Sequence, residues 1–154
     1  MNFNKIIKFL VSIIICQLAG VIGAVFTTPE INSWYKSLNK PSFNPPSWVF
    51  GPAWTMLFIL MGISLYIVWS KKISFRNILI FAIQLAINIL WSVVFFGMHS
   101  PSAAFFVLLL LWVAILFTII NFYKVSKIAA WLLVPYILWV SFAGILNLAI
   151  FLLN

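Results

Sequence analysis

The sequence predicts an all-α integral membrane protein in which five transmembrane helices form one bundle, with a long loop after the first helix. Of the 154 residues, 66% are hydrophobic and only 6% are charged, whereas about a quarter of the residues of a soluble domain are charged. Five apolar runs also approach the roughly 20 residues that a helix needs to cross a bilayer. The expected helices belong to a single domain, residues 1–154, and cover residues 6–26, 47–70, 78–97, 103–122 and 128–153.

The first span carries small residues at intervals of three or four. Its apolar run is longer than the roughly 7–15 residues of a signal-peptide core, so we expect a retained helix. Small side chains at this spacing make one helix face smooth enough for another backbone to approach closely. That face serves either packing within the chain or an interface between subunits, and it consists of Cys16, Ala19, Gly20, Gly23 and Ala24.

A loop rich in proline and tryptophan, Trp34–Trp54, separates the first two spans. Four of the seven prolines fall here, and they exclude one regular helix because each internal proline removes a hydrogen-bond donor. Ser47 is expected to cap the second helix, and Pro52 lies close enough to its start to be tolerated. We expect any recognition beyond membrane residence to involve this loop and the helix faces beneath it.

Two further prolines mark the later spans. Pro101 sits where the first turn of the fourth helix accepts a proline, whereas Pro135 falls inside the fifth span and predicts a kink or a loosened turn. The connections over residues 71–77, 98–102 and 123–127 are too short to hold a domain. We therefore expect one compact bundle. Its odd number of spans places the two termini on opposite sides of the membrane.

The basic residues predict the orientation of the bundle in a cell membrane. Seven of the nine lie on the side of the amino terminus, and Lys36 and Lys40 lie on the other side. The positive-inside rule then places the amino terminus in the cytoplasm, with the long loop and Asn154 outside. Because the basic residues occupy short gaps between apolar runs, the net charge of +8 indicates topology and argues against nucleic-acid binding.

The absence of certain residue types from the predicted spans excludes several functions. No charged side chain lies deep in a predicted span, which argues against an ion-coupled transporter. Glu30 is the single carboxylate side chain, so a hydrolytic triad or a carboxylate pair is excluded. One cysteine, Cys16, and one histidine, His99, cannot form a multi-ligand metal site, and we expect no metal. His99 is predicted to be solvated in a loop.

Three spans carry aromatic and polar side chains along one helical face. In the third span, Gln84, Asn88, Trp91 and Phe95 follow at intervals of four, three and four residues, which places them on one strip. Amides in hydrocarbon need partners, so this strip is expected to point inward. The matching strips are Trp54, Phe58, Met61 and Leu65 in the second span, and Pro135, Trp139, Ala143 and Leu146, with Asn147 beside them, in the fifth.

These strips allow two interpretations. They surround an aromatic-walled pocket beneath the loop, or they fill a solid core while other tryptophans, such as Trp69 and Trp131, anchor the helices at the membrane interface. A pocket walled by indoles suits a flat, apolar, conjugated ligand, because stacking needs area and the indole N–H supplies one polar contact.

Five motifs spread over nearly the whole chain carry a resemblance to a known family. They are GAVFT at Gly23–Thr27, WY at Trp34–Tyr35, KPSFNPPSWVFGPAW at Lys40–Trp54, QLAINILWSVVFFG at Gln84–Gly97 and PYILWVSFAGILNLAIF at Pro135–Phe151. The loop motif is long and unusual. With these motifs the chain resembles the tryptophan-rich sensory protein or translocator protein family (TspO/MBR), which includes the mitochondrial peripheral benzodiazepine receptor.

The resemblance implies five transmembrane helices, commonly assembled as a homodimer, and no required cofactor. It implies binding of porphyrins such as protoporphyrin IX, of haem-related tetrapyrroles, and of isoquinoline carboxamide and benzodiazepine drugs. The family's pocket lies among the helices under the first loop. The implied contacts are Trp54, Asn88, Trp91, Trp139, Phe142 and Ala143, and the loop residues expected to form a lid are Trp34, Tyr35, Pro41, Phe43, Pro45, Pro46 and Trp48.

The resemblance further implies a photochemical role for Trp54 and Trp139. The corresponding indoles of bacterial members have been linked to light- and oxygen-dependent breakdown of bound porphyrin, in which the ligand itself makes the reactive oxygen. Departures from the family pattern are Phe43 in place of tryptophan, Val107 in place of an acidic residue, and a fifth helix without the cholesterol motif, so sterol transport is not implied. The alternatives to such a receptor are a transporter of porphyrin-like molecules and a structural membrane partner protein.

Overall fold

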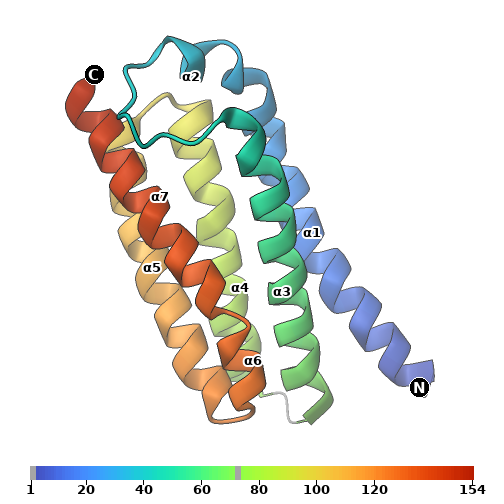
Figure 1. Cartoon of the computed structure of the whole chain (residues 1–154). Coiled ribbons are helices and arrows are strands. Elements are labelled where there is room, and N and C mark those ends of the chain that lie inside the picture. The colour runs from blue at the N-terminus through green and yellow to red at the C-terminus, as the bar shows by residue number, and fades with distance from the viewer. Residues whose placement is uncertain (1–2, 72–73) are drawn as a thin grey trace.

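Helices form the whole regular structure of residues 3–71 and 74–154, which the computed structural model describes (Figure 1). Within these ranges five spans are long and apolar enough to cross a membrane, so the chain is a multi-pass membrane protein of the predicted class. The two termini lie at opposite ends of the bundle (Figure 1). The elements are α1 (Phe3–Ile31), α2 (Trp34–Ser37), the 3₁₀ turn η1 (Ser47–Val49), α3 (Phe50–Lys71), α4 (Phe75–Ser92), the π-helical turn η2 (Val93–Gly97), α5 (Pro101–Tyr123), α6 (Lys127–Trp131) and α7 (Val134–Leu153).

The first span extends past its predicted end. α1 ends at Ile31, whereas the sequence pattern predicts an end near Phe26. Pro29 lies inside the helix, but close to its end a proline removes only one backbone hydrogen bond. The extra turn brings Glu30 to the level of the long loop.

α6 and α7 replace the single fifth helix that the sequence predicts. The helix is interrupted at Leu132 and Leu133, and Pro135 occupies the first turn of α7, where a proline is tolerated. The turn before the proline is therefore loosened, which is one of the two predicted outcomes, and Pro135 itself begins the next helix. The interruption leaves the backbone carbonyl of Ala129 without a helical partner, and the hydroxyl of Ser64 on α3 donates to it at 2.7 Å.

The second and third spans depart from a regular α-helix at their ends near the loop. Pro46 holds the N-cap position of η1, so the prediction that Ser47 caps this helix is wrong. η2 closes α4 with a wider turn, in which the backbone N–H of Met98 donates to the carbonyl of Val93 at 2.9 Å. Such π-helical turns are rare and often lie at functional sites.

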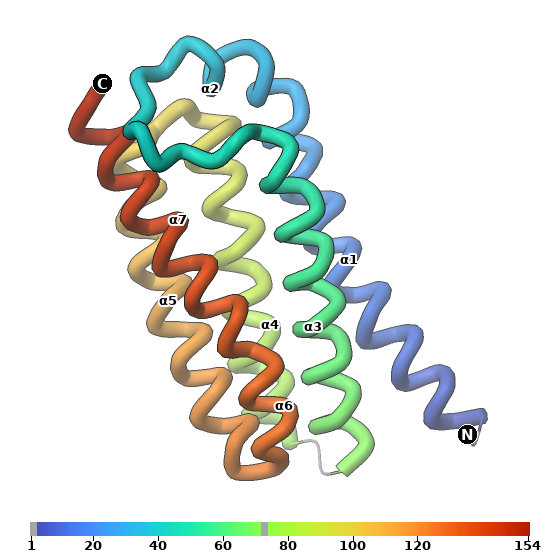
Figure 2. The backbone as a smooth tube through the Cα atoms, viewed as in Figure 1, coloured from blue at the N-terminus to red at the C-terminus, as the bar shows by residue number. Residues whose placement is uncertain are grey.

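The small-residue face of α1 packs within the chain. Cys16 and Ala19 are buried, and a Cβ atom on Gly62 of α3 would lie 2.9 Å from the Cα of Ile13. The two backbones therefore approach closely at this point, one turn before Cys16, whereas Ala24 at the other end of the small-residue face is exposed. Figure 2 shows α1 leaning away from the other helices toward its amino-terminal end.

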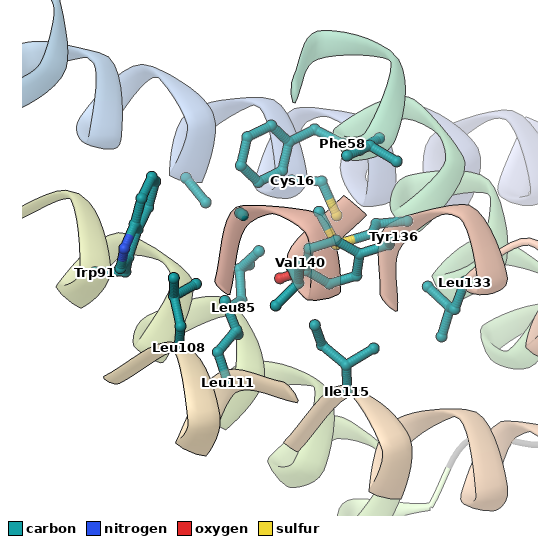
Figure 3. Close-up of a cluster of buried hydrophobic side chains, with 14 of the residues drawn as sticks. Cys16, Phe58, Leu85, Trp91, Leu108, Leu111, Ile115, Leu133, Tyr136 and Val140 are labelled. Carbon is teal, nitrogen blue, oxygen red and sulfur yellow. The ribbon is translucent and has the colours of Figure 1, made fainter. Parts of the chain in front are cut away.

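The interior of the bundle is solid in its middle. Figure 3 shows side chains of all five spans, such as Cys16, Phe58 and Ile115, turned toward one another around Tyr136. Tyr136, Cys16 and Ile115 have no exposed surface. The predicted inward strip of α4 is confirmed, because Gln84, Asn88, Trp91 and Phe95 are all buried.

We expect Gly62→Ala to destabilise the protein by about 1–3 kcal/mol, because the added methyl group overpacks the contact with α1. Gly144→Ala on α7 is the matched control, since a Cβ atom there meets no atom within 4 Å. That change is expected to be neutral or stabilising, because alanine favours a helix more than glycine does. Thermal unfolding in detergent measures both, and equal melting temperatures for the two variants would contradict the prediction.

Candidate ligand-binding site

A cavity of about 290 Å³ lies under the long loop, enclosed by α1, α2, α3, α4, η2 and α7. Its floor is the solid middle of the bundle, where Met61 and Tyr136 are fully buried. The exposed residues of its lining, among them Val21, Gly51 and Thr55, lie on α1 and α3. The cavity therefore opens between these two helices, below the loop.

Indole and phenyl rings from three spans wall the cavity. The ring of Trp54 on α3 lies 6.1 Å from that of Trp91 on α4 and 6.2 Å from that of Tyr136 on α7. Trp139 lies 5.7 Å from Phe142 on the same helix. Offset and edge-to-face contacts at these separations fix the orientation of each ring, so the walls are preformed.

The six residues expected to contact a ligand all line this cavity. They come from α3, α4 and α7, and they are Trp54, Asn88, Trp91, Trp139, Phe142 and Ala143. The sequence missed the contribution of α1, whose small and polar side chains at positions 17, 20, 23, 24, 27 and 28 form the opposite wall. Their spacing suggested a packing face, and no aromatic residue marked them as part of a site.

Hydrogen bonds hold most of the polar groups around the cavity. Trp91 Nε1 donates to Asn147 Oδ1 at 3.2 Å, and Asn88 Nδ2 donates to the hydroxyl of Tyr136 at 2.9 Å. Trp139 differs, because its buried Nε1 has no acceptor within the described residues. Buried donors are normally paired, so this N–H is available to an acceptor on a ligand.

Tyr35 forms the roof of the cavity. It is 4% exposed, and its hydroxyl donates to Asn44 Oδ1 at 2.7 Å, which ties α2 to the middle of the loop. Burial raises the pKa of Tyr35 from 10.0 to about 12. The buried, protonated side chain therefore contributes its full stability below pH 10, and this contribution is lost as the pH rises through about 12.

Polar contacts at the surface hold the rest of the loop in place. The backbone N–H of Asn39 donates to Asn154 Oδ1 at 2.9 Å, and Asn154 Nδ2 donates to the carbonyl of Asn39 at 3.0 Å. Lys40 Nζ donates to the carbonyls of Tyr35 and Leu38 at 2.7 and 2.8 Å. The contacts between Asn39 and Asn154 are exposed, whereas those of Lys40 are partly buried.

The other six expected lid residues do not line the cavity. The ring centroid of Phe43 lies 6.5 Å from that of Phe142, and Trp48 is 74% exposed. Trp34 packs 5.4 Å from Phe95, on the outer side of the roof. The three prolines, Pro41, Pro45 and Pro46, shape the loop without lining the cavity.

Comparison with known proteins shows the family of the chain. The model of the TspO/MBR family matches residues 12–153. The chain belongs to the TspO/MBR family. It is 45% identical to the tryptophan-rich protein TspO of Chlorobaculum tepidum, over 98% of both chains. It is 43% identical to the TspO of Archaeoglobus fulgidus, over 97% of this chain and 99% of the relative, and 38% identical to the human translocator protein, over 85% and 80%.

In this TspO/MBR chain one contact between a histidine and a carboxylate is present among the described residues, and it lies beside the roof. His99 Nε2 lies 3.1 Å from Glu30 Oε2, and the imidazole stacks on Trp34 with ring centroids 4.5 Å apart. His99 lies exposed in the loop after η2, as predicted, and the contacts with Glu30 and Trp34 add to that prediction. The contact could not be foreseen, because it depends on the extra turn of α1 and on the positive φ of 51° at His99.

Proposed function

We propose that this TspO/MBR protein is a membrane receptor that binds a flat, largely apolar aromatic ligand, with porphyrins such as protoporphyrin IX as the physiological class. The observation that carries this proposal is the cavity of about 290 Å³ with indole rings from three helices in its walls. Aromatic rings stack on flat conjugated ligands over a large area. The free Nε1 of Trp139 offers a hydrogen bond to a ligand nitrogen or carboxylate.

The size of the cavity supports two modes of binding. Its volume lies near the lower end of the roughly 300–1,000 Å³ that drug-sized ligands occupy, which suits isoquinoline carboxamide or benzodiazepine compounds. A porphyrin is larger, so its binding requires the loop to lift. The water-exposed contacts between Asn39 and Asn154 are the ones that such a movement breaks.

The arrangement favours a receptor over a transporter of porphyrin-like molecules. Under the cavity the described bundle is packed by fully buried side chains such as Met61, Leu133 and Tyr136, which block a path along its axis. The opening lies between α1 and α3, so we propose that the ligand enters from the membrane or from the loop side. From the distribution of lysine and arginine we also propose that the loop faces outward.

A second candidate function is light- and oxygen-dependent breakdown of the bound porphyrin. The observation that favours it is the cluster of oxidisable rings, in which Trp54 lies within 6.2 Å of both Trp91 and Tyr136. An excited porphyrin can take an electron from a neighbouring indole and pass it to dioxygen, which leaves an indole radical cation and superoxide, and the superoxide formed beside the ligand then oxidises the porphyrin ring. The protein then contributes position and electron supply, while the ligand carries the photochemistry.

Titration of the purified protein with protoporphyrin IX, followed by tryptophan fluorescence, tests the binding proposal. We expect saturable quenching with one ligand per chain, because the rings of Trp54, Trp91 and Trp139 line a single cavity. An isoquinoline carboxamide should compete for the same site. Quenching that rises without saturation, as for a dye dissolving in detergent, would reject the proposal.

A further inference from the structure

A second hollow lies at the end of the bundle remote from the loop. It has a volume of about 240 Å³, and it is formed where α4 begins and α5 ends. Figure 1 shows these two helix ends at the opposite end of the molecule from α2. The residues that line the hollow are Ser74, Arg76, Asn77, Asn121, Lys124 and Val125.

The hollow is cationic and lacks a counter-ion from the protein. Arg76 and Lys124 both line it, and neither makes an ion pair with a described residue. The only carboxylate side chain of the sequence, Glu30, is at the other end of the bundle, where it contacts His99. Two like charges at one concavity repel each other, so an anion from outside would relieve the repulsion.

Neutral donors complete the lining. Asn77 is only 7% exposed and lines the hollow, and its side-chain amide makes no hydrogen bond within the described part of the chain, so it can bind a ligand there. Asn121 Nδ2 uses one hydrogen on the carbonyl of Phe117, at 2.7 Å, and keeps a second. Ser74 Oγ accepts from the backbone N–H of Asn77 at 3.3 Å, so its own hydrogen is free to donate.

We propose that this hollow binds the phosphate group of an anionic ligand. A guanidinium, an ammonium group, neutral amides and the first turn of a helix together match the charge and the several acceptor oxygens of a phosphate. The hollow lies where membrane helices end, so the phosphate belongs either to the headgroup of an anionic phospholipid, for which basic pockets between helices are suited, or to a soluble phosphate compound. The proposal does not depend on the function of the larger cavity.

The test uses the delipidated full chain in a neutral detergent. Native mass spectrometry compares the retention of phosphatidylglycerol with that of phosphatidylcholine. Thermal unfolding in the presence of inorganic phosphate tests whether a soluble phosphate compound binds. The double variant Arg76→Gln, Lys124→Gln removes the cations of the hollow. The matched control Lys5→Gln, Lys127→Gln removes the same charge from the same end, outside the hollow. Asn77→Ala changes no charge and decides the question if the double variant fails to fold.

We expect the double variant to lose at least about tenfold in affinity for its phosphate ligand, and Asn77→Ala to lose several-fold, because hydrogen bonds to charged groups are strong. The control pair should change the affinity much less. A preference for phosphatidylglycerol alone would identify a lipid headgroup, and stabilisation by inorganic phosphate would identify a soluble source. Equal losses in both pairs with no effect of Asn77→Ala, or no response of the native chain to either probe, would overturn the proposal.

Discussion

Replacing Ala143 with phenylalanine is expected to weaken protoporphyrin binding by about 100-fold or more, equivalent to about 2.7 kcal/mol. Ala143 is 8% exposed and forms part of the α7 wall of the cavity. A phenyl ring at this position would occupy the space that the ligand needs, so binding would require the ring to be displaced into packed neighbours. Tryptophan quenching by protoporphyrin IX measures the effect directly.

Ile145→Phe is the matched control for this prediction. Ile145 lies two residues further along α7, but its side chain is 61% exposed and does not line the cavity. The same ring added there should leave binding unchanged within about twofold, as for most exposed substitutions. Native affinity in a folded Ala143→Phe protein, judged by its melting temperature, would show that the ligand binds elsewhere.

Replacing Trp54 and Trp139 with phenylalanine is expected to slow photodegradation of bound porphyrin by roughly tenfold or more, which corresponds to a modest change in barrier of about 1.4 kcal/mol. Phenylalanine keeps the apolar wall, but it is much harder to oxidise than an indole and lacks the N–H of Trp139. Binding should therefore weaken much less than the reaction slows. Loss of the Soret absorbance under illumination measures the rate, and titration in the dark measures the affinity.

The control for the tryptophan variants is Trp131→Phe on α6. Trp131 is 67% exposed and is absent from the cavity lining, so its replacement removes an indole without touching the site. An unchanged rate of Soret loss in the Trp54 and Trp139 variants would reject the proposed part of these indoles, while leaving the binding proposal intact.

The spans and the inward faces could be predicted from the sequence because both follow from local periodicity. A bilayer demands about 20 apolar residues per helix, and the 3.6-residue repeat placed Gln84, Asn88 and Trp91 on one buried strip. The same repeat predicted that Trp54 and Ala143 lie on inward-facing strips, and both line one cavity in the structure. The helical spacing thus predicted most of the side chains that face each other across the bundle.

The ends of the helices and the loop could not be predicted in the same way, because tertiary contacts decide them. Pro29 reads as a helix breaker, yet α1 continues through it. The loosened turn before Pro135 was predicted, but its partner Ser64, a residue of another span that binds the freed carbonyl, was not. Prolines and tryptophans marked the loop as unusual, but only the fold shows that Tyr35 turns inward while Trp48 turns outward.

The wide turn Val93–Gly97 also bears on how this chain tolerates insertions and deletions. A π-helical turn accommodates one residue more than an α-helical turn does. Deleting a single residue there would restore a regular α-helical turn and leave the following residues on nearly the same face, because the wide turn already takes up the extra residue. His99 would then stay beside Trp34, whereas a deletion in the regular part of α4 would rotate everything after it by roughly 100° about the axis.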